Sequence, residues 1–114
     1  MHANELKHGK VYDCTMDGNL GVEKTSIVPL ATDAQTNQRF IIIGAKKLQD
    51  ANPDFFRRLI AMSFHEIVDE DLDGGPDRHW SAFVWKFTLD EHGFLYYEDY
   101  DCYLDDFVEE DRTK

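Results

Sequence analysis

The side chains of this sequence that could do chemistry are mainly carboxylates, and most of them lie in its second half. Residues 66–114 carry 16 Asp and Glu against four Lys and Arg, whereas residues 1–65 carry seven acidic and eight basic residues. The net charge of −11 on the 114-residue chain therefore resides in one segment. Because like charges crowded together raise the energy of the compact state, this segregation indicates a surface that binds a cationic partner. A plain acidic face that keeps the protein soluble is the alternative.

One group of acids follows the alternation of a predicted strand. Asp99, Asp101 and Asp105 share one face of that strand, because alternate residues point the same way and lie ~6.6 Å apart. Tyr97 and Tyr103 lie among them and would add rigid contact area. A DNA strand carries one phosphate per ~3.4 Å of helix axis, a charge density of the same order. The row therefore predicts a surface that imitates a phosphate backbone, with an ordinary solvated hairpin face as the alternative.

A second group of acids follows the predicted main helix. Asp69, Asp71 and Asp73 match the Asp-x-Asp-x-Asp-Gly opening of a calcium-binding loop, and Asp77 stands at its ninth position. The twelfth position, which should supply a bidentate Glu, is Trp80. Calcium binding by these four aspartates is therefore one alternative beside a flexible acidic turn and a partner contact.

Other residue types form no catalytic or metal-binding pattern. Cys14 and Cys102 are too few for a disulfide scaffold or a zinc site of thiolates, and carboxylates beside Cys102 favour a high thiol pKa. The five histidines show no pair at metal-ligand spacing. No glycine-rich phosphate loop or nucleophile elbow stands out. We therefore expect a protein that is not an enzyme and that uses no cofactor.

The elements that must position the acids follow from hydrophobic periodicity and turn signals. Strands are predicted at residues 9–16, 22–31 and 39–44, and a hairpin is predicted at residues 80–89 and 94–104.

One main helix is predicted at residues 53–68, where Asn52 suits the N-cap and Pro53 the first turn. A short helical turn is expected after Leu104. Pro29 cannot donate a hydrogen bond to a neighbouring strand, so its strand should be bulged or lie at an edge. Together these elements predict a single α+β domain of order βββαββ, in which an antiparallel sheet packs on one main helix.

The charge also narrows the classes of partner. A net charge of −11 repels phosphates and anionic lipids, so direct binding to nucleic acid or to a membrane surface is disfavoured. The longest apolar run, residues 40–43, is far shorter than the ~20 residues of a membrane span. The first residues lack the apolar stretch of a signal peptide. We expect a soluble, cytoplasmic monomer with a basic partner.

In size, charge and acid segregation over residues 66–114, the chain resembles the bacterial and phage DNA-mimic proteins. These are small, strongly acidic, single-domain inhibitors that occupy the DNA-binding surface of a basic protein. The resemblance implies binding to a basic DNA-binding protein, such as a histone-like nucleoid protein, and inhibition of its DNA binding. An immunity protein or antitoxin that neutralises a basic nuclease or toxin is the first alternative, and a calcium-binding module is the second.

The residues expected to bind the partner are the acids of the helix exit and of the last hairpin, with the tyrosines between them. They are Glu66, Asp69, Glu70, Asp71, Asp73, Asp77, Tyr97, Asp99, Asp101, Tyr103, Asp105, Asp106, Glu109 and Glu110. Their carboxylates would replace DNA phosphates at Lys and Arg side chains of the partner.

Overall fold

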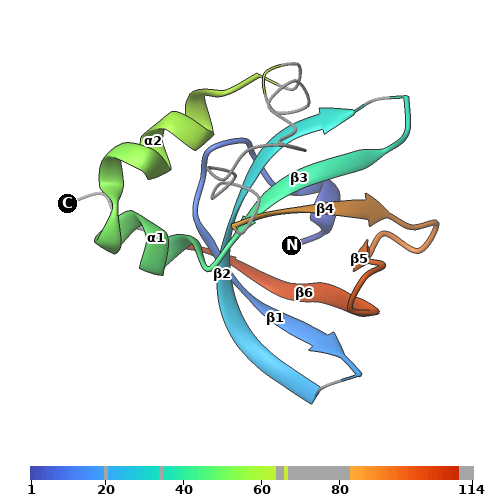
Figure 1. Ribbon diagram of the computed structural model, residues 1–114. Helices are drawn as coiled ribbons and strands as arrows, with labels where there is room; N and C mark the ends of the chain where they lie inside the picture. Colours follow the sequence, from blue (N-terminus) through green and yellow to red (C-terminus); the bar gives the residue numbers. More distant parts are fainter. Residues whose placement is uncertain (20, 34, 64–65, 67–82, 111–114) are drawn as a thin grey trace.

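Six antiparallel strands close into a barrel in the computed structural model of this chain, which describes residues 1–19, 21–33, 35–63, 66 and 83–110. Each strand pairs with the next along the chain, and the last pairs with the first to close the barrel (Figure 1). The strands are β1 (Tyr12–Gly18), β2 (Gly21–Asp33), β3 (Gln38–Ile43), β4 (Val84–Leu89), β5 (Leu95–Tyr97) and β6 (Cys102–Glu109).

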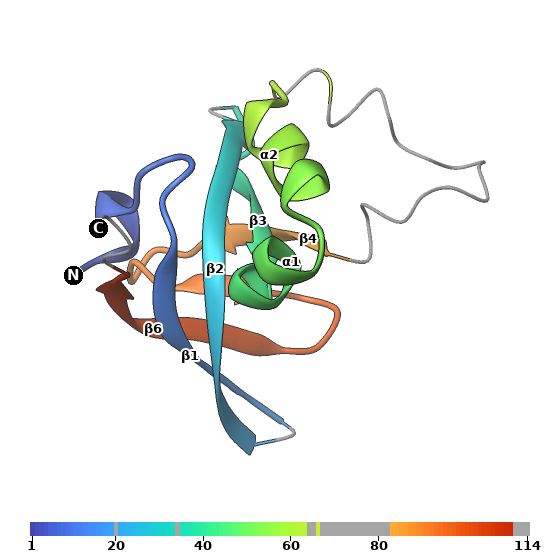
Figure 2. The ribbon, with the colours of Figure 1, turned by 90° about the vertical axis from the view of Figure 1, so that its left-hand side faces the viewer.

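Two short helices, α1 (Ala45–Ala51) and α2 (Pro53–Ala61), follow β3 in the chain. Figure 2 shows both of them outside the barrel, beside β2 and β3. A 3₁₀ helix, η1 (Ala3–Glu5), precedes β1. The predicted start of α2 is confirmed, because the Asn52 side chain accepts a hydrogen bond from the Phe55 backbone N–H at 3.2 Å.

Alternation along the strands produces two apolar cores, one on each side of the barrel wall. Inward-pointing side chains fill the barrel with a buried cluster of Ala3, Tyr12, Cys14, Ile27, Ile41, Phe87, Leu95, Leu104 and Phe107. Outward-pointing side chains of β2, β3 and β4 pack against the helices in a second cluster of Val28, Leu30, Ile42, Ala45, Leu48, Phe56, Leu59 and Val84. The two cores explain why residues 40–43 form an uninterrupted apolar run: Ile41 faces the barrel interior, and Ile42 faces the helices.

The predicted architecture, one antiparallel sheet packed on one main helix, is wrong because the first and last strands pair with each other. Closure requires curvature, and the strand register shifts between Asp13 and Thr15 on the β1–β6 seam and between Pro29 and Thr32 on the β2–β3 seam. Such bulges bend and twist strands. The irregularity predicted at Pro29 is confirmed as one of these bulges.

The predicted main helix differs from the helices of the structure in length and in number. The prediction covered residues 53–68, whereas α2 ends at Ala61, and residues 67–68 lie outside the described part of the chain. Helix α1, in which Ala45 and Leu48 are the buried residues, was not predicted from the sequence. A helix of two turns with so few buried positions has no repeating apolar stripe.

The strand predicted over residues 94–104 is two strands joined by a turn. β5 ends at Tyr97, and the turn that follows contains Asp101 with a φ of 49°. β6 then continues as a strand where a terminal helical turn was predicted. The turn resets the alternation, so that Tyr97 packs in the barrel interior while Tyr103 is exposed. The two tyrosines therefore do not share the single face that the sequence predicted.

A methyl group at Gly18 should weaken the seam between β1 and β6. A Cβ at this position would lie 2.6 Å from Cys102 Cβ and 3.0 Å from the Asp101 carbonyl oxygen, so the two strands would have to separate. We expect Gly18→Ala to lower the free energy of unfolding by about 1–3 kcal/mol, the usual range for overpacking. Urea denaturation measures this difference. Thr15→Ala, on the outer side of the same strand, is the control with a smaller expected loss, and equal losses would contradict the close contact at Gly18.

Candidate functional site

Closure of the barrel brings acidic side chains from both ends of the chain onto one surface. In the β1–β6 pairing, Asp17 lies opposite Tyr103, and Thr15 lies opposite Asp105. Asp17 and Asp105 are thus diagonal neighbours, which in a sheet lie ~7–8 Å apart. Two carboxylates at this separation contribute to one common negative potential. We call this surface the acidic face, and it consists of Asp13, Asp17, Tyr103, Asp105, Asp106 and Val108.

Ion pairs neutralise one flank of the acidic face. Lys46 Nζ on α1 lies 2.7 Å from Asp13 Oδ1 and 2.9 Å from Glu110 Oε2. Hydrogen bonds to these two carboxylates raise the pKa of Lys46. Beside them, Lys10 Nζ lies 3.1 Å from Glu109 Oε2. Glu109 and Glu110, both predicted to bind a partner, therefore already have cationic neighbours within the chain.

The other part of the acidic face carries carboxylates that form no ion pair within the described part of the chain. The described Lys and Arg side chains form no ion pair with Asp17, Asp105 or Asp106. Asp105 Oδ1 accepts a hydrogen bond from the Asp106 backbone N–H at 2.8 Å, which leaves its negative charge without a cation. Tyr103 and Val108 lie on the same face and are 39% and 61% exposed. Unpaired carboxylates beside an exposed ring and an exposed aliphatic side chain suit a protein partner that brings cations.

The remaining predicted residues of the last hairpin do not extend this face as a row. Tyr97 is half-buried inside the barrel. Its hydroxyl donates a hydrogen bond to Asp99 at 3.3 Å. Asp101 accepts hydrogen bonds from the Asn19 side chain at 3.1 Å and from the Tyr96 hydroxyl at 2.9 Å. The turn between β5 and β6 therefore engages both carboxylates in contacts within the chain.

Of the acids predicted after the main helix, the structure describes Glu66. Its side chain is exposed and accepts a hydrogen bond from the Ser63 backbone N–H at 2.8 Å, a contact that lowers the pKa of Glu66. The others lie outside the described residues, and with them the calcium-binding alternative: Asp69, Glu70, Asp71, Asp73 and Asp77.

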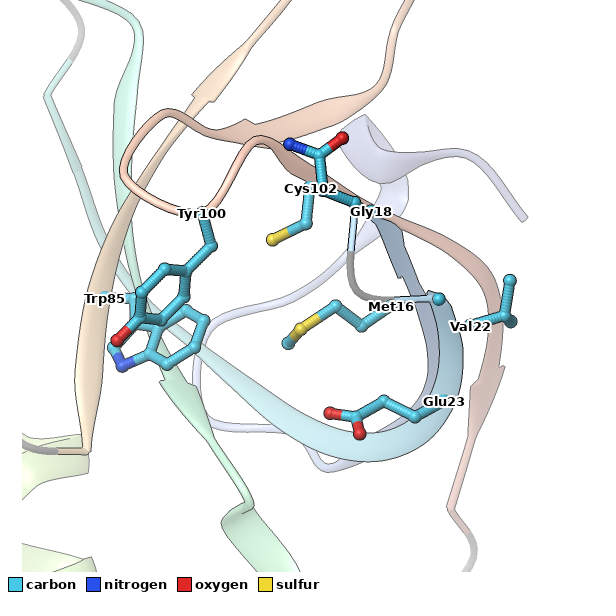
Figure 3. Close-up of a pocket in the computed structure, with 9 residues that line it drawn as sticks. Met16, Gly18, Val22, Glu23, Trp85, Tyr100 and Cys102 are labelled. Carbon is cyan, nitrogen blue, oxygen red and sulfur yellow. The ribbon is translucent and has the colours of Figure 1, made fainter.

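A cavity of about 200 Å³ opens at the end of the barrel where β1 turns into β2. We call it the end cavity, and it is lined by Met16, Gly18, Asn19, Gly21, Val22, Glu23, Trp85, Tyr100 and Cys102. Figure 3 shows Met16 and Cys102 pointing across this space toward Trp85 and Tyr100. This cavity could not be predicted from the sequence, because its residues come from separate segments that only the closed barrel brings together.

Stacked aromatic rings support one wall of the end cavity. The Trp85 and Tyr97 rings stack with their centroids 4.4 Å apart and their planes 19° from parallel. The Phe87 ring, buried in the barrel core, lies with its centroid 5.3 Å from that of Tyr97. Aromatic pairs at such distances add to the energy of burial. The Trp85 ring is therefore held in place from the core side.

Both cysteines are free and buried. Burial raises the pKa of the Cys14 thiol from 9.0 to about 12, with a further contribution from the charge of Asp13. Burial also raises the pKa of Cys102, and the charges of Asp101 and Glu23 add to the effect. Because the thiolate is the reactive form, both side chains behave as apolar groups at neutral pH.

In the part of the chain that the structure describes, no group of three or more His, Cys, Asp or Glu side chains is placed to hold a metal ion. None of the described helices has the length and apolar character needed to cross a membrane. No protein family, curated protein or solved structure matches the chain.

The buried Cys14 thiol should make the protein less stable in alkali. Its pKa is about 12 in the folded protein against 9.0 for an ordinary thiol. As the pH rises above 9, the unfolded chain loses this proton first, so it binds fewer protons than the folded protein and stability falls. We expect a loss of about 2 kcal/mol between about pH 8 and pH 10.5 from this group.

The measurement is urea unfolding of the wild type and of Cys14→Ala over that pH range. Other groups titrate in both proteins, so the difference between their free energies of unfolding isolates Cys14. That difference should shrink as the pH rises. A constant difference would show that the thiol is not desolvated in the folded protein.

Proposed function

We propose that the protein is a DNA mimic, which binds a basic DNA-binding protein through the acidic face and keeps DNA from the same surface. The observation that carries this proposal is the set of unpaired carboxylates of Asp17, Asp105 and Asp106 on two neighbouring strands. The expected spacing of Asp17 and Asp105, ~7–8 Å along the diagonal of the sheet, is of the same order as the ~3.4 Å of axis per phosphate on a DNA strand. Lys and Arg side chains that contact phosphates would meet carboxylates instead.

Two other properties support this function. The net charge of −11 accelerates encounter with a basic protein at low salt. Tyr103 and Val108 then offer side-chain area that a partner can desolvate, and such contacts hold a complex together after encounter. The proposed partner is a protein that holds DNA mainly by backbone charge, such as a histone-like nucleoid protein.

Removing two charges from the acidic face should weaken partner binding without unfolding the protein. The test variant is Asp17→Asn with Asp105→Asn, and the readout is displacement of a fluorescently labelled duplex from a histone-like nucleoid protein. We expect displacement to need about tenfold more of this variant, because each lost charge contact is worth roughly 0.5–1 kcal/mol. The melting temperature should stay equal or rise, since the substitutions remove repulsion between two carboxylates.

The matched control is Asp54→Asn with Glu91→Gln, which removes the same charge from α2 and from the turn after β4. It should displace the duplex almost as well as the wild type. Equal loss in both double variants would leave only the net charge as a cause and would contradict a specific acidic face. Failure of the wild type to displace the duplex at about 0.1 M salt, where the screening length is ~10 Å, would contradict the DNA-mimic function. Binding to a basic nuclease that persists at about 0.5 M salt would indicate the immunity-protein alternative instead.

A further inference from the structure

The end cavity has an aromatic corner at its wall. The Trp85 and Tyr100 rings meet edge to face, with their centroids 5.2 Å apart and their planes at 72°. The Tyr100 ring makes a similar contact with Tyr97, at 5.4 Å and 77°. In such a pair the edge of one ring lies against the face of the other, and the remaining ring surface forms a corner open to the cavity. A cation over an aromatic ring face is attracted by the negative charge of that face, and alkylated ammonium groups are bound in this way.

Glu23 adds a formal negative charge to the same cavity. Figure 3 shows its carboxylate pointing from β2 into the space below Met16, on the side where Trp85 and Tyr100 lie. No Lys or Arg of the described residues forms an ion pair with it. Its charge also acts inside the cavity, because it contributes to the raised pKa of the Cys102 thiol. A carboxylate opposite aromatic faces favours a cation over a neutral group of the same shape.

The size of the cavity limits what enters it. At about 200 Å³, it is smaller than the ~300–1,000 Å³ of sites for drug-sized ligands. It is somewhat larger than a cavity of ~150 Å³ that holds one benzene molecule. The cavity therefore fits a compact head group or the end of one side chain, and Met16, with its flexible thioether, lets the wall adjust to it.

We propose that the end cavity binds an alkylated ammonium group, which contacts the Trp85 and Tyr100 rings and is balanced by Glu23. The group belongs either to a free quaternary amine or to a methylated lysine side chain of a protein, since both present the same chemistry. This site shares no residue with the acidic face. Ligand binding in the end cavity can therefore be tested independently of the proposed DNA-mimic function.

The test compares two probes of one shape and different charge on the full chain. Choline carries the quaternary ammonium, and 3,3-dimethylbutan-1-ol is its neutral counterpart, in which carbon replaces nitrogen. Titration calorimetry and the NMR signal of the Trp85 indole N–H report binding, with Trp80→Phe used to assign the indole signal. We expect choline to bind at least about fivefold more tightly than the alcohol. Equal binding of the two probes, or no choline binding at about 10 mM, would overturn the proposal.

Variants of the cavity then separate charge from aromatic contact. Glu23→Gln and Tyr100→Leu should each weaken choline binding about fivefold. Glu23 is exposed at the rim, so an unchanged melting temperature is expected for Glu23→Gln. Tyr100→Leu loses the ring contacts with Trp85 and Tyr97, so a small fall of its melting temperature is expected without unfolding. Glu91→Gln, in the turn at the opposite end of the barrel, removes the same charge and should leave choline binding unchanged. Equal effects of Glu23→Gln and Glu91→Gln would contradict a local role for Glu23.

A final comparison identifies the source of the ammonium group. Short peptides that contain trimethyllysine or unmodified lysine are titrated under the same conditions as choline. Tighter binding of the trimethyllysine peptide than of choline supports a protein side chain as the ligand. Tighter binding of choline supports a free quaternary amine. Preference for the unmodified lysine peptide over both methylated probes would overturn the alkylated group proposed here.

Discussion

The pairing of β1 with β6 is the constraint on which the rest of the structure depends. It leaves none of the six described strands with an unpaired edge. The seam is closest at Gly18, where the β1 backbone approaches Cys102 with no room for a side chain. Because this seam exists, aspartates from β1 lie beside those of β6. The same seam completes the end cavity, whose lining comes from β1, β2, β4, β6 and the turn before β6.

Closure of the barrel also places alternate side chains of a strand in different environments, one in the core and the next on the surface. On β6, Leu104 packs in the barrel core, whereas Tyr103 and Asp105 face solvent. The bulge in this strand leaves Asp106 exposed with a φ of 56° and returns Phe107 to the core. Binding groups and core groups therefore alternate along the same backbone. A change on the outer face alters the charge of the surface without opening a void in the core.

Local features of this fold could be predicted from the sequence, but the pairing of distant strands could not. The cap at Asn52 and the bulge at Pro29 depend on residues within a few positions. The pairing of β1 with β6 could not be predicted in this way. Alternation of apolar residues shows which side of a strand is buried, but it does not show which strand lies beside it. The turn around Tyr100 contains no Gly or Pro, so it read as a continuing strand. The acids of β6 could be identified from the sequence because they lie close together in the chain. The contribution of Asp17 and the whole end cavity could not be predicted, because both depend on the pairing of distant strands.

Both proposed sites attract cations, but the acidic face acts through long-range attraction between charges and the end cavity through direct contact with aromatic rings. The acidic face is exposed to solvent, where attraction beyond ~10 Å is screened at about 0.1 M salt. A cation in the end cavity would touch the rings of Trp85 and Tyr100 directly, and contact at that range is screened much less. Asp17 of the acidic face is followed on β1 by Gly18, which lines the end cavity, so one strand contributes to both sites. If the basic partner carries a methylated lysine, the end cavity would therefore add a short-range contact that persists when salt weakens attraction to the acidic face.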